Sequence, residues 1–463
     1  MAETLIGLLA FIFILGAAVV LHEFGHFIVA KLFGMRVETF SVGFGPRLFG
    51  RRFGTTDYRL SLIPLGGYVK LGGDESNAAV EGASESDIPV NERFDLRPRW
   101  QKFLVMVAGP TMNIITALTV VWAGAMIAGV PVSPASPTVR YVKPQGVAEA
   151  GGVRVGDRII AFNGKENPSW ERVINDVRLS PEQPLPMTVE RGGQRVELSI
   201  KPIKEVIDGE SIGDIDFSPD YGQLPVMISL VNPGSPAEQA GLKVNDRVIA
   251  VNGQPVRDEF DVRSLIQVHR SAAVNLTIER DGQRQELTAT TSAEGKLGFG
   301  PASVLPQERV GPIAALGYAV RRNLEVLRMT GAAFGQIFSG QRSARESLSG
   351  PIGIAKASSD AATKFGWAGV FAMLGFLSLN LGIVNLLPIP VLDGGAIFLL
   401  GVEAVLGWVG LKLSMTIRER IQQVGMVMLL LLMGFVITND LVKVASRWGA
   451  SDDAKPAATE PAK

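Results

Sequence analysis

Four apolar stretches dominate the pattern of hydrophobic and polar positions along this chain. Crossing the hydrocarbon core of a bilayer takes about 20 predominantly apolar residues in a helix. The pattern therefore predicts four transmembrane helices. Together with their flanks they cover residues 1–34, 101–130, 367–396 and 422–442.

The segment between the first two spans, residues 35–100, has a different pattern. From Thr56 to Lys70 apolar and polar positions alternate, which is typical of a strand that ends near Pro64 and Gly66-Gly67. We expect a small β-hairpin or sheet, either dipping into the membrane or lying at its cytoplasmic surface. Residues 73–92 are acidic, small and polar, so we expect a mobile linker there.

Basic residues indicate the orientation of the spans. Residues 31–102 contain many Lys and Arg, whereas the three residues ahead of the first span contain none. Cytoplasmic loops are enriched in Lys and Arg. We therefore expect residues 35–100 in the cytoplasm and residues 131–305 outside, although Lys443 and Arg447 after the last span weakly oppose this topology.

The outer segment contains an internal repeat at an offset of 89 residues. Residues 148–164 match residues 237–253 at 10 of 17 positions, and each copy predicts a short helix, a strand and an Asn-Gly turn. The pattern resembles the core of a PDZ domain, so we expect two PDZ-like α+β domains, at residues 131–222 and 223–305.

The role of these domains stays open between peptide binding along a sheet edge and a steric spacer. A Gly-Leu-Gly-Phe loop is not evident, but Leu297-Gly298-Phe299-Gly300 lies where a permuted arrangement would supply one. Their place between the second and third spans suggests that they filter by size what reaches the membrane segments.

The remaining segments are simpler. Apolar residues recur two to four apart from 310 to 339, which predicts amphipathic helices in residues 306–366. These helices would lie at the membrane surface or pack on the repeat. Residues 397–421 are expected to form a cytoplasmic loop, because they contain Lys412, Arg418 and Arg420, and residues 443–463 a tail, disordered from Ser451.

Composition and charge restrict the function classes. The 45 basic and 45 acidic residues cancel, so bulk charge does not favour a nucleic-acid partner. The chain has no cysteine, which excludes thiol nucleophiles, thiolate metal ligands and disulfides. It has only three histidines.

Two of the three histidines lie in the first apolar stretch, in the motif His22-Glu23-Phe24-Gly25-His26. On a helix, positions i and i+4 share a face, so both imidazoles can reach one metal ion while Glu23 stays free to act as a base. The motif occurs by chance in soluble helices. Between apolar flanks it predicts a Zn²⁺ site inside the membrane.

A second polar cluster ends the third span. Pro388 and Pro390 prevent a regular helix, and the freed carbonyls must be satisfied by protein or by a cavity. Asp393 follows this break, and an intramembrane carboxylate is a functional hypothesis by default. Two histidines and one carboxylate are a ligand set of catalytic zinc hydrolases. Asn113, in the second span, is expected to pack helices rather than to take part in chemistry.

Two other functions stay open at this point. A non-catalytic membrane scaffold would use the PDZ-like domains and keep the spans as anchors. A metal transporter would also place histidines and an aspartate in lipid, but it would need polar residues in several spans, and residues 426–436 of the fourth have none.

These motifs together resemble the site-2 protease family of intramembrane zinc metalloproteases. The resemblance rests on the His22 to His26 motif, on the run from Asn385 to Gly394 (NLLPIPVLDG) and on the two intervening PDZ-like domains, and it covers nearly the whole chain. It implies that His22, His26 and Asp393 bind zinc and that Glu23 is the catalytic base.

The resemblance also implies how substrates bind. The region from Gly43 to Tyr68 would be a membrane-reentrant sheet that presents substrate as an added strand, and Asn385 would hold the unwound substrate. The substrate-binding residues expected on this basis are Asn385, Gly43, Gly45, Gly66 and Gly67.

The implied partners are membrane lipid and single-pass membrane proteins, above all a trimmed anti-sigma factor and also signal-peptide remnants. No nucleic acid is expected. The expected fold is an α-helical membrane protein with four transmembrane helices, a membrane-associated β-sheet and two periplasmic PDZ-like domains, in a bacterial inner membrane.

Overall fold

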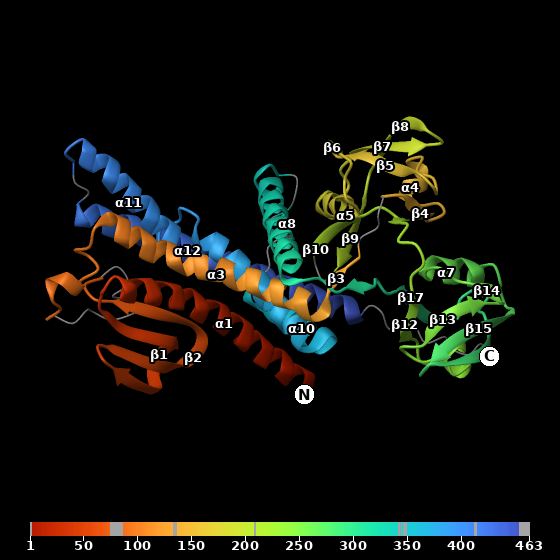
Figure 1. Ribbon diagram of the computed structural model, residues 1–463, viewed down its shortest axis with the longest axis horizontal. Helices are drawn as coiled ribbons and strands as arrows, with labels where there is room; N and C mark the ends of the chain where they lie inside the picture. Colours follow the sequence, from red (N-terminus) through yellow and green to blue (C-terminus); the bar gives the residue numbers. More distant parts are fainter. Residues whose placement is uncertain are drawn as a thin grey trace, which may run out of the picture. The chain divides into compact units, whose positions relative to one another are not determined.

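The computed structural model describes residues 2–74, 87–132, 137–207, 210–340, 343, 345, 350–411 and 414–452. The chain divides into two compact units, shown in Figure 1. Residues 1–127 and 310–463 form the membrane unit, and residues 128–309 form the repeat unit. Most of the expected linker at residues 73–92 and of the expected tail lies outside the described residues.

The membrane unit contains the four predicted apolar helices. They are α1 (Ala2–Leu32), α3 (Arg99–Ala128), α10 (Pro351–Asn385) and α12 (Met415–Asp452). Each is long and apolar enough to cross a membrane, which confirms the prediction of four spans. Large apolar side chains on them are exposed, such as Leu5 at 58% and Leu431 at 70%, as lipid-facing surfaces require.

Two of these helices extend beyond the expected limits. The helix α10 already begins at Pro351, and its two halves meet at a kink at Gly366, whose φ of 58° is not helical. The helix α12 continues beyond residue 442 to Asp452. The chain thus enters the third span directly from a preceding helix.

A sheet packs against α1 (Figure 1). It consists of β1 (Val37–Phe53) and β2 (Thr56–Leu71), which both bend. Val42 of β1 pairs with Leu60 on one side and with Gly67 on the other, so the first part of β1 lies between two parts of β2. The last part of β2, residues 67–71, is therefore an edge of the sheet.

The end that the sequence predicts for this strand is wrong. The strand does not stop at Pro64, because the chain bends at Gly66, with φ of 137°, and returns along β1 as far as Leu71. Gly43 and Gly45 also have positive φ, 91° and 86°. Such φ values favour glycine, so these residues shape bends within one continuous sheet rather than separate turns.

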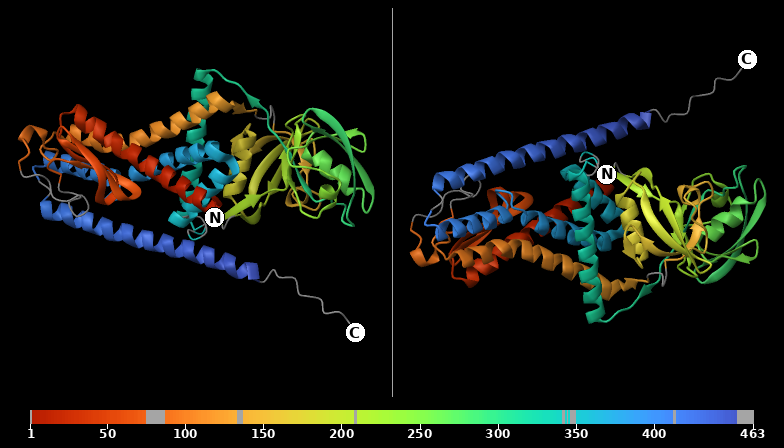
Figure 2. Two further views of the ribbon diagram at one scale, coloured as in Figure 1. Left: turned by 90° about the horizontal axis from the view of Figure 1, so that it is seen from below. Right: turned by 90° about the horizontal axis from the view of Figure 1, so that it is seen from above.

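The described part of the membrane unit also contains the helices α8 and α11 (Asp393–Trp408) and the short 3₁₀ helix η1 (Val90–Glu92). The helix α8 (Pro312–Phe338) confirms the period predicted over residues 310–339 and runs across the long helices (Figures 1 and 2). Thr330 of α8 donates to Asn380 Oδ1 of α10 over 3.1 Å. Helix α8 therefore contacts α10.

The expectation of a loop at residues 397–421 is wrong in large part. The helix α11 spans Asp393–Trp408. The basic residues behind that expectation, from Lys412 onward, all lie beyond this helix. Residues 394–402 are themselves apolar, and they continue as helix after the proline-rich break.

The repeat unit contains two sets of elements in the same order, except that the first set has two additional strands, β9 and β10. The first set is β4 (Val139–Val142), α4 (Val147–Ala150), β5 (Arg158–Phe162), β6 (Lys165–Glu166), α5 (Trp170–Leu179), β7 (Leu185–Arg191), β8 (Gln194–Ile200), β9 (Ile203–Ile207), β10 (Glu210–Asp214) and β11 (Phe217–Pro219). The second is β12 (Val226–Val231), α6 (Pro236–Gln239), β13 (Arg247–Val251), β14 (Gln254–Pro255), α7 (Glu259–Gln267), β15 (Ala273–Arg280), β16 (Gln283–Thr290) and β17 (Phe299–Ser303).

Each repeat has its own core and sheet. The strand orders are β6-β5-β7-β8 in the first repeat and β16-β15-β13-β12-β17 in the second. Phe162 and Trp170 are buried in the first core, and Leu276 and Ile278 in the second. The short helix, the strand and the Asn-Gly turn predicted for each copy are all present, with positive φ at both residues of each turn.

Candidate active site

The two motif histidines lie side by side on α1. His22 and His26 are 5% and 8% exposed, and their Nε2 atoms are 3.2 Å apart. Gly25 lets α3 approach this face, since a Cβ atom there would lie 2.3 Å from the Ala108 carbonyl oxygen. The helical spacing thus produces the shared face that the sequence predicts.

Helix α3 fixes the orientation of both rings. His26 Nδ1 donates to the Val105 carbonyl oxygen over 2.7 Å, which leaves Nε2 for another partner. His22 Nδ1 lies 3.2 Å from the Asn113 side-chain amide, and Ser378 donates to the Asn113 main-chain oxygen. Partners of this kind fix the tautomer and angle of a metal-binding imidazole.

The Asp393 carboxylate lies beside the two histidine rings, although it comes from a distant part of the chain. It is the first residue of α11, after a bend in which Val391 has a φ of 86°. Its Oδ2 lies 3.0 Å from His22 Nε2 and 3.5 Å from His26 Nε2. The structure therefore brings together residues that are 367 positions apart in the sequence.

The donor atoms of His22, His26 and Asp393 fit a metal ion. All three converge within 4.8 Å of one another, and they are the one such cluster in the part of the chain that the structure describes. Asp393 Oδ2 is buried, and the Nε2 atoms of His22 and His26 lie beside it at 3.0 and 3.5 Å. Imidazole and carboxylate donors suit Zn²⁺, and a cation would satisfy this oxygen.

Glu23 lies beside this cluster and next to the edge of the sheet. Its carboxylate accepts a hydrogen bond from the Val69 backbone. A cavity of about 360 Å³ is lined by Glu23, both histidines, Asp393 and the edge residues Gly67, Tyr68, Val69 and Leu71. A carboxylate, a metal-binding cluster and a strand edge thus share one cavity.

The residues expected to bind substrate divide into two groups. Asn385 lines the cavity, with Nδ2 3.2 Å from His22 Nε2, and Gly67 also lines it. Gly43, Gly45 and Gly66 are not among the described residues that line it. They shape the sheet instead, since a Cβ on Gly66 would lie 2.3 Å from the Phe44 ring.

Sequence reasoning missed the contribution of the second span. It assigned Asn113 to helix packing, which its hydrogen bond with Ser378 of α10 confirms, but it did not foresee the contact with His22. The Gly109-Pro110-x-x-Asn113 pattern was the available signal, because glycine and asparagine in a span indicate close approach and a polar contact. The sequence does not indicate that the Val105 carbonyl accepts a hydrogen bond from His26, since every residue has a carbonyl.

Comparisons with known proteins show which family this chain belongs to. The model of peptidase family M50 matches residues 10–432. The regulator of sigma-E protease RseP of Salmonella typhimurium is 31% identical over 471 residues, which cover 96% of this chain and 100% of that protein. RseP of Escherichia coli is 31% identical over 464 residues, covering 94% and 98%.

A putative zinc metalloprotease of Vibrio cholerae is also 31% identical, over 478 residues that cover 96% of this chain and 100% of that protein. Neither a non-catalytic scaffold nor a metal transporter is supported by these matches. With its four apolar helices, the chain is a multi-pass membrane protein. It belongs to peptidase family M50 and is an intramembrane zinc metalloprotease of the site-2 type.

Proposed function

We propose that His22, His26 and Asp393 hold the zinc ion of this protease and that Glu23 is its general base. The observation that carries this assignment is the convergence of three donor atoms in one cavity with Glu23. The reaction is hydrolysis of a peptide bond within the membrane-spanning part of a substrate.

Zinc bound here supplies an acidified water and polarises the scissile carbonyl. The proton of this water is transferred by a residue of the chain. Glu23 takes it from the water and passes it to the leaving nitrogen, so both proton transfers use one carboxylate. Asn385 offers an amide next to His22, where it can bind the substrate backbone.

A helical substrate must first unwind, because helix hydrogen bonds occupy its carbonyl groups. Among the described residues, the edge at residues 67–71 pairs only with β1, through Gly67↔Val42, Tyr68↔Ser41 and Val69↔Phe40. Its other side faces the cavity. An unwound substrate added there regains backbone hydrogen bonds that lipid cannot provide.

The substrate class follows from the relatives. Two of them are named regulator of sigma-E protease, which supports a single-pass anti-sigma factor as substrate, with signal-peptide remnants as a second class. We assign the protein to a bacterial inner membrane, with residues 35–100 in the cytoplasm and the repeat unit in the periplasm. The basic residues of segment 31–102 support this topology.

The test is cleavage of a tagged single-pass substrate together with metal analysis. His22→Ala and Asp393→Asn are expected to lose zinc and cleavage together, since each removes one of three protein ligands. Asp360→Asn, which changes an aspartate whose ionic partner among the described residues is Lys364 on α10, is the matched control and should keep both. A His22→Ala or Asp393→Asn enzyme that retains zinc would refute the ligand assignment.

We also infer that the two repeats are PDZ-like domains and that the second binds peptide. It contains a groove of about 400 Å³ between α7 and β17. Val262, Ile266 and Leu297 supply apolar lining, and Leu297-Gly298-Phe299 closes one end. A groove between a helix and a strand edge is the site at which such domains bind an extended chain.

A further inference from the structure

The sheet of the membrane unit has a second edge, on the side away from the active site. It consists of residues 47–53 of β1, which pair with residues 56–61 of β2. Residues 45–53 are exposed, except for the half-buried Gly50. The described residues that line the catalytic cavity include the edge at residues 67–71 but none of residues 45–53. The second edge is therefore separate from the substrate-binding cavity.

The second edge runs from the depth of the zinc site toward the membrane surface. Phe44, in the bend that precedes it, lines the catalytic cavity together with His22. At the other end of the edge, Thr56 Oγ1 donates to the Val37 carbonyl oxygen over 2.7 Å. Val37 follows shortly after α1 ends at Leu32, after an apolar stretch long enough to cross the membrane. The hairpin end thus lies near the level at which α1 leaves the lipid.

One face of this edge is apolar. Phe49 and Phe53 alternate along β1, so they share a face, and they are 77% and 76% exposed. Phe49 pairs with Leu60, which is 44% exposed. On the same face of β2, the Tyr58 ring lies 5.9 Å from the Phe27 ring of α1. Exposed apolar side chains that continue the surface of a membrane helix suit contact with lipid acyl chains.

Arginine side chains gather at the hairpin end of this edge. Arg47 is in register with Ser61, yet its Nη1 lies 3.3 Å from Asp57 Oδ1, four positions closer to the hairpin end. It passes Gly50, where a Cβ atom would lie 3.0 Å from Arg47 Nε. Arg59 Nη2 lies 2.8 Å from Asp57 Oδ2, so one carboxylate serves two guanidinium groups. Long cationic side chains in lipid turn toward the surface in this way.

The region around the second edge carries an excess of positive charge. Residues 45–63 contain four arginines and one acidic residue, Asp57. Arg51 and Arg52 are exposed at the hairpin end, and Arg52 is in register with Asp57, the partner of Arg47. Guanidinium groups bind phosphate oxygens in a bidentate manner. Anionic lipid headgroups attract such clusters at a membrane surface.

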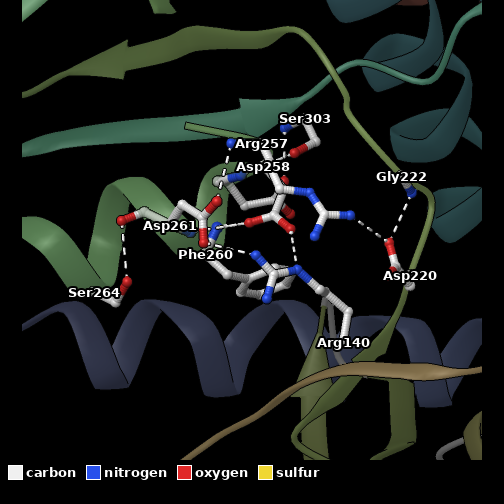
Figure 3. Close-up of polar contacts among 10 residues, drawn as sticks. Arg140, Asp220, Gly222, Arg257, Asp258, Phe260, Asp261, Ser264 and Ser303 are labelled. Atoms are coloured by element: carbon white, nitrogen blue, oxygen red, sulfur yellow. Dashed lines mark hydrogen bonds and ion pairs between the residues drawn. The ribbon is translucent and has the colours of Figure 1, made fainter. Parts of the chain in front are cut away.

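Polar contacts in the repeat unit have the opposite balance of charge (Figure 3). Arg140 lies 3.1 Å from Asp258 and 2.8 Å from Asp261. Arg257 lies 3.3 Å from Asp220. In this group of residues the carboxylates outnumber the guanidinium groups. An arginine of that unit therefore provides a control whose charge is already balanced.

We propose that the second edge binds an anionic phospholipid, with the phosphate on Arg47, Arg51 and Arg52 and the acyl chains along Phe49 and Leu60. The order of the side chains matches that of a lipid, since the apolar pair lies deeper and the arginines lie toward the surface. Bound lipid would anchor the sheet whose opposite edge borders the catalytic cavity. This binding site is additional to peptide hydrolysis and does not depend on which substrate is cleaved.

The test places a fluorescent label at this edge. Leu48 is 60% exposed, and the sequence has no cysteine, so Leu48→Cys carries a bimane label at one position only. The full chain is placed in phosphatidylcholine nanodiscs that contain a small fraction of nitroxide-labelled lipid, either phosphatidylglycerol or phosphatidylcholine with the same acyl chains. We expect the phosphatidylglycerol to quench at least about threefold more strongly, because it gathers at the arginines. Equal quenching by the two lipids would overturn the proposal, and this comparison needs no arginine variant.

Arginine variants then identify the groups that bind the headgroup. Arg47→Gln, Arg51→Gln and Arg52→Gln together should reduce the preference to less than about 1.5-fold, because the phosphate loses its charge partners. Arg257→Gln is the matched control, since the Arg257 and Arg47 side chains are 47% and 44% exposed and each lies 3.3 Å from its aspartate. It should leave the preference unchanged. A preference that survives loss of the three arginines, falls in Arg257→Gln or disappears when free inorganic phosphate is added would contradict the proposal.

Discussion

Asn113 shows how one buried amide can prepare a histidine for metal binding. A ring that binds metal through Nε2 carries its proton on Nδ1. The Asn113 amide lies 3.2 Å from His22 Nδ1, so it serves this tautomer when its oxygen faces the ring. Ser378 continues to donate to the main-chain oxygen of Asn113 over 3.0 Å in that orientation.

Asn113→Ala is therefore expected to weaken zinc binding by about 10- to 100-fold, because His22 loses its positioning partner. Competition with a chelator of known affinity measures this directly. Asn323→Ala is the matched control, since Asn323 is also buried but, within the part of the chain that the structure describes, donates to Ala319 O of its own helix α8. Equal zinc affinity in the parent and in Asn113→Ala would show that Asn113 does not position His22 for metal binding.

Among the elements, α3 matters because it passes very close to the histidines. A Cβ atom on Gly109 would lie 2.3 Å from His26 Nε2 and 2.8 Å from His22 Cε1. The helix can pass here only because Gly109 has no side chain. Close approach through glycine is a common device of membrane helices.

Gly109→Ala should therefore displace His26 and abolish both zinc binding and cleavage, although the change is a single methyl group. Gly124→Ala in the same helix, where a Cβ would meet nothing within 4 Å, should leave both unchanged. Metal analysis of the two purified variants makes the comparison. Full zinc occupancy in Gly109→Ala would show that α3 does not constrain the site.

Each repeat contains the same ion pair between an arginine and a buried aspartate. Arg191 donates to Asp157 and to Gly152 O, and Arg280 makes the same contacts with Asp246 and Gly241 O, at the repeat offset of 89 residues. Burial alone would raise the pKa of Asp157. The hydrogen bonds from Arg191 and from the Arg154 N–H, with their positive charges, outweigh burial and lower it below its usual value.

A carboxyl whose folded pKa lies below its unfolded pKa stabilises the fold above pH about 4 and loses that contribution as pH falls through the folded pKa. Asp157→Asn should therefore destabilise the first repeat by about 2 kcal/mol at pH 7, with a difference that shrinks below pH about 4. Hydrogen exchange of peptides from residues 137–223 measures this. Glu197→Gln, at an exposed position of β8, is the control, and a pH-independent difference would contradict the ion-pair account.

At the scale of elements, the sequence predicts features that depend on nearby residues better than features that depend on contacts between distant residues. The His22 to His26 motif, the four spans and the repeat follow from periodicity and spacing, which depend on nearby residues. The return of β2 beyond Pro64 depends on pairing with residues 37–42, which a strand pattern does not encode. The contact of Asn113 with His22 requires knowing which faces of two helices meet, and single-sequence periodicity does not give that.

For the whole molecule, the repeat unit is an insertion whose two ends meet. The strand β3 (Val130–Pro131) pairs with β18 (Gln307–Glu308), and Val132 N–H donates to Pro306 O over 3.0 Å. The chain thus leaves and re-enters through one two-stranded ribbon. A segment with adjacent ends can be removed without pulling apart its anchors.

Replacing residues 133–305 by a short Gly-Ser turn should therefore leave zinc content intact. If the repeats filter substrates by size, this variant should cleave full-length and trimmed substrates at similar rates, whereas the parent should prefer the trimmed one. Cleavage assays on both substrates with both proteins measure the effect. Continued preference for the trimmed substrate would show that selection lies elsewhere.

The most direct measurement of the central claim is the zinc content and cleavage rate of Glu23→Gln, taken on the same preparation. Because Glu23 is a base and not a ligand in this account, the variant should keep one zinc per chain. Its rate should fall at least about 100-fold. Cleavage near the parent rate with zinc bound would contradict the assignment of Glu23 as the catalytic base.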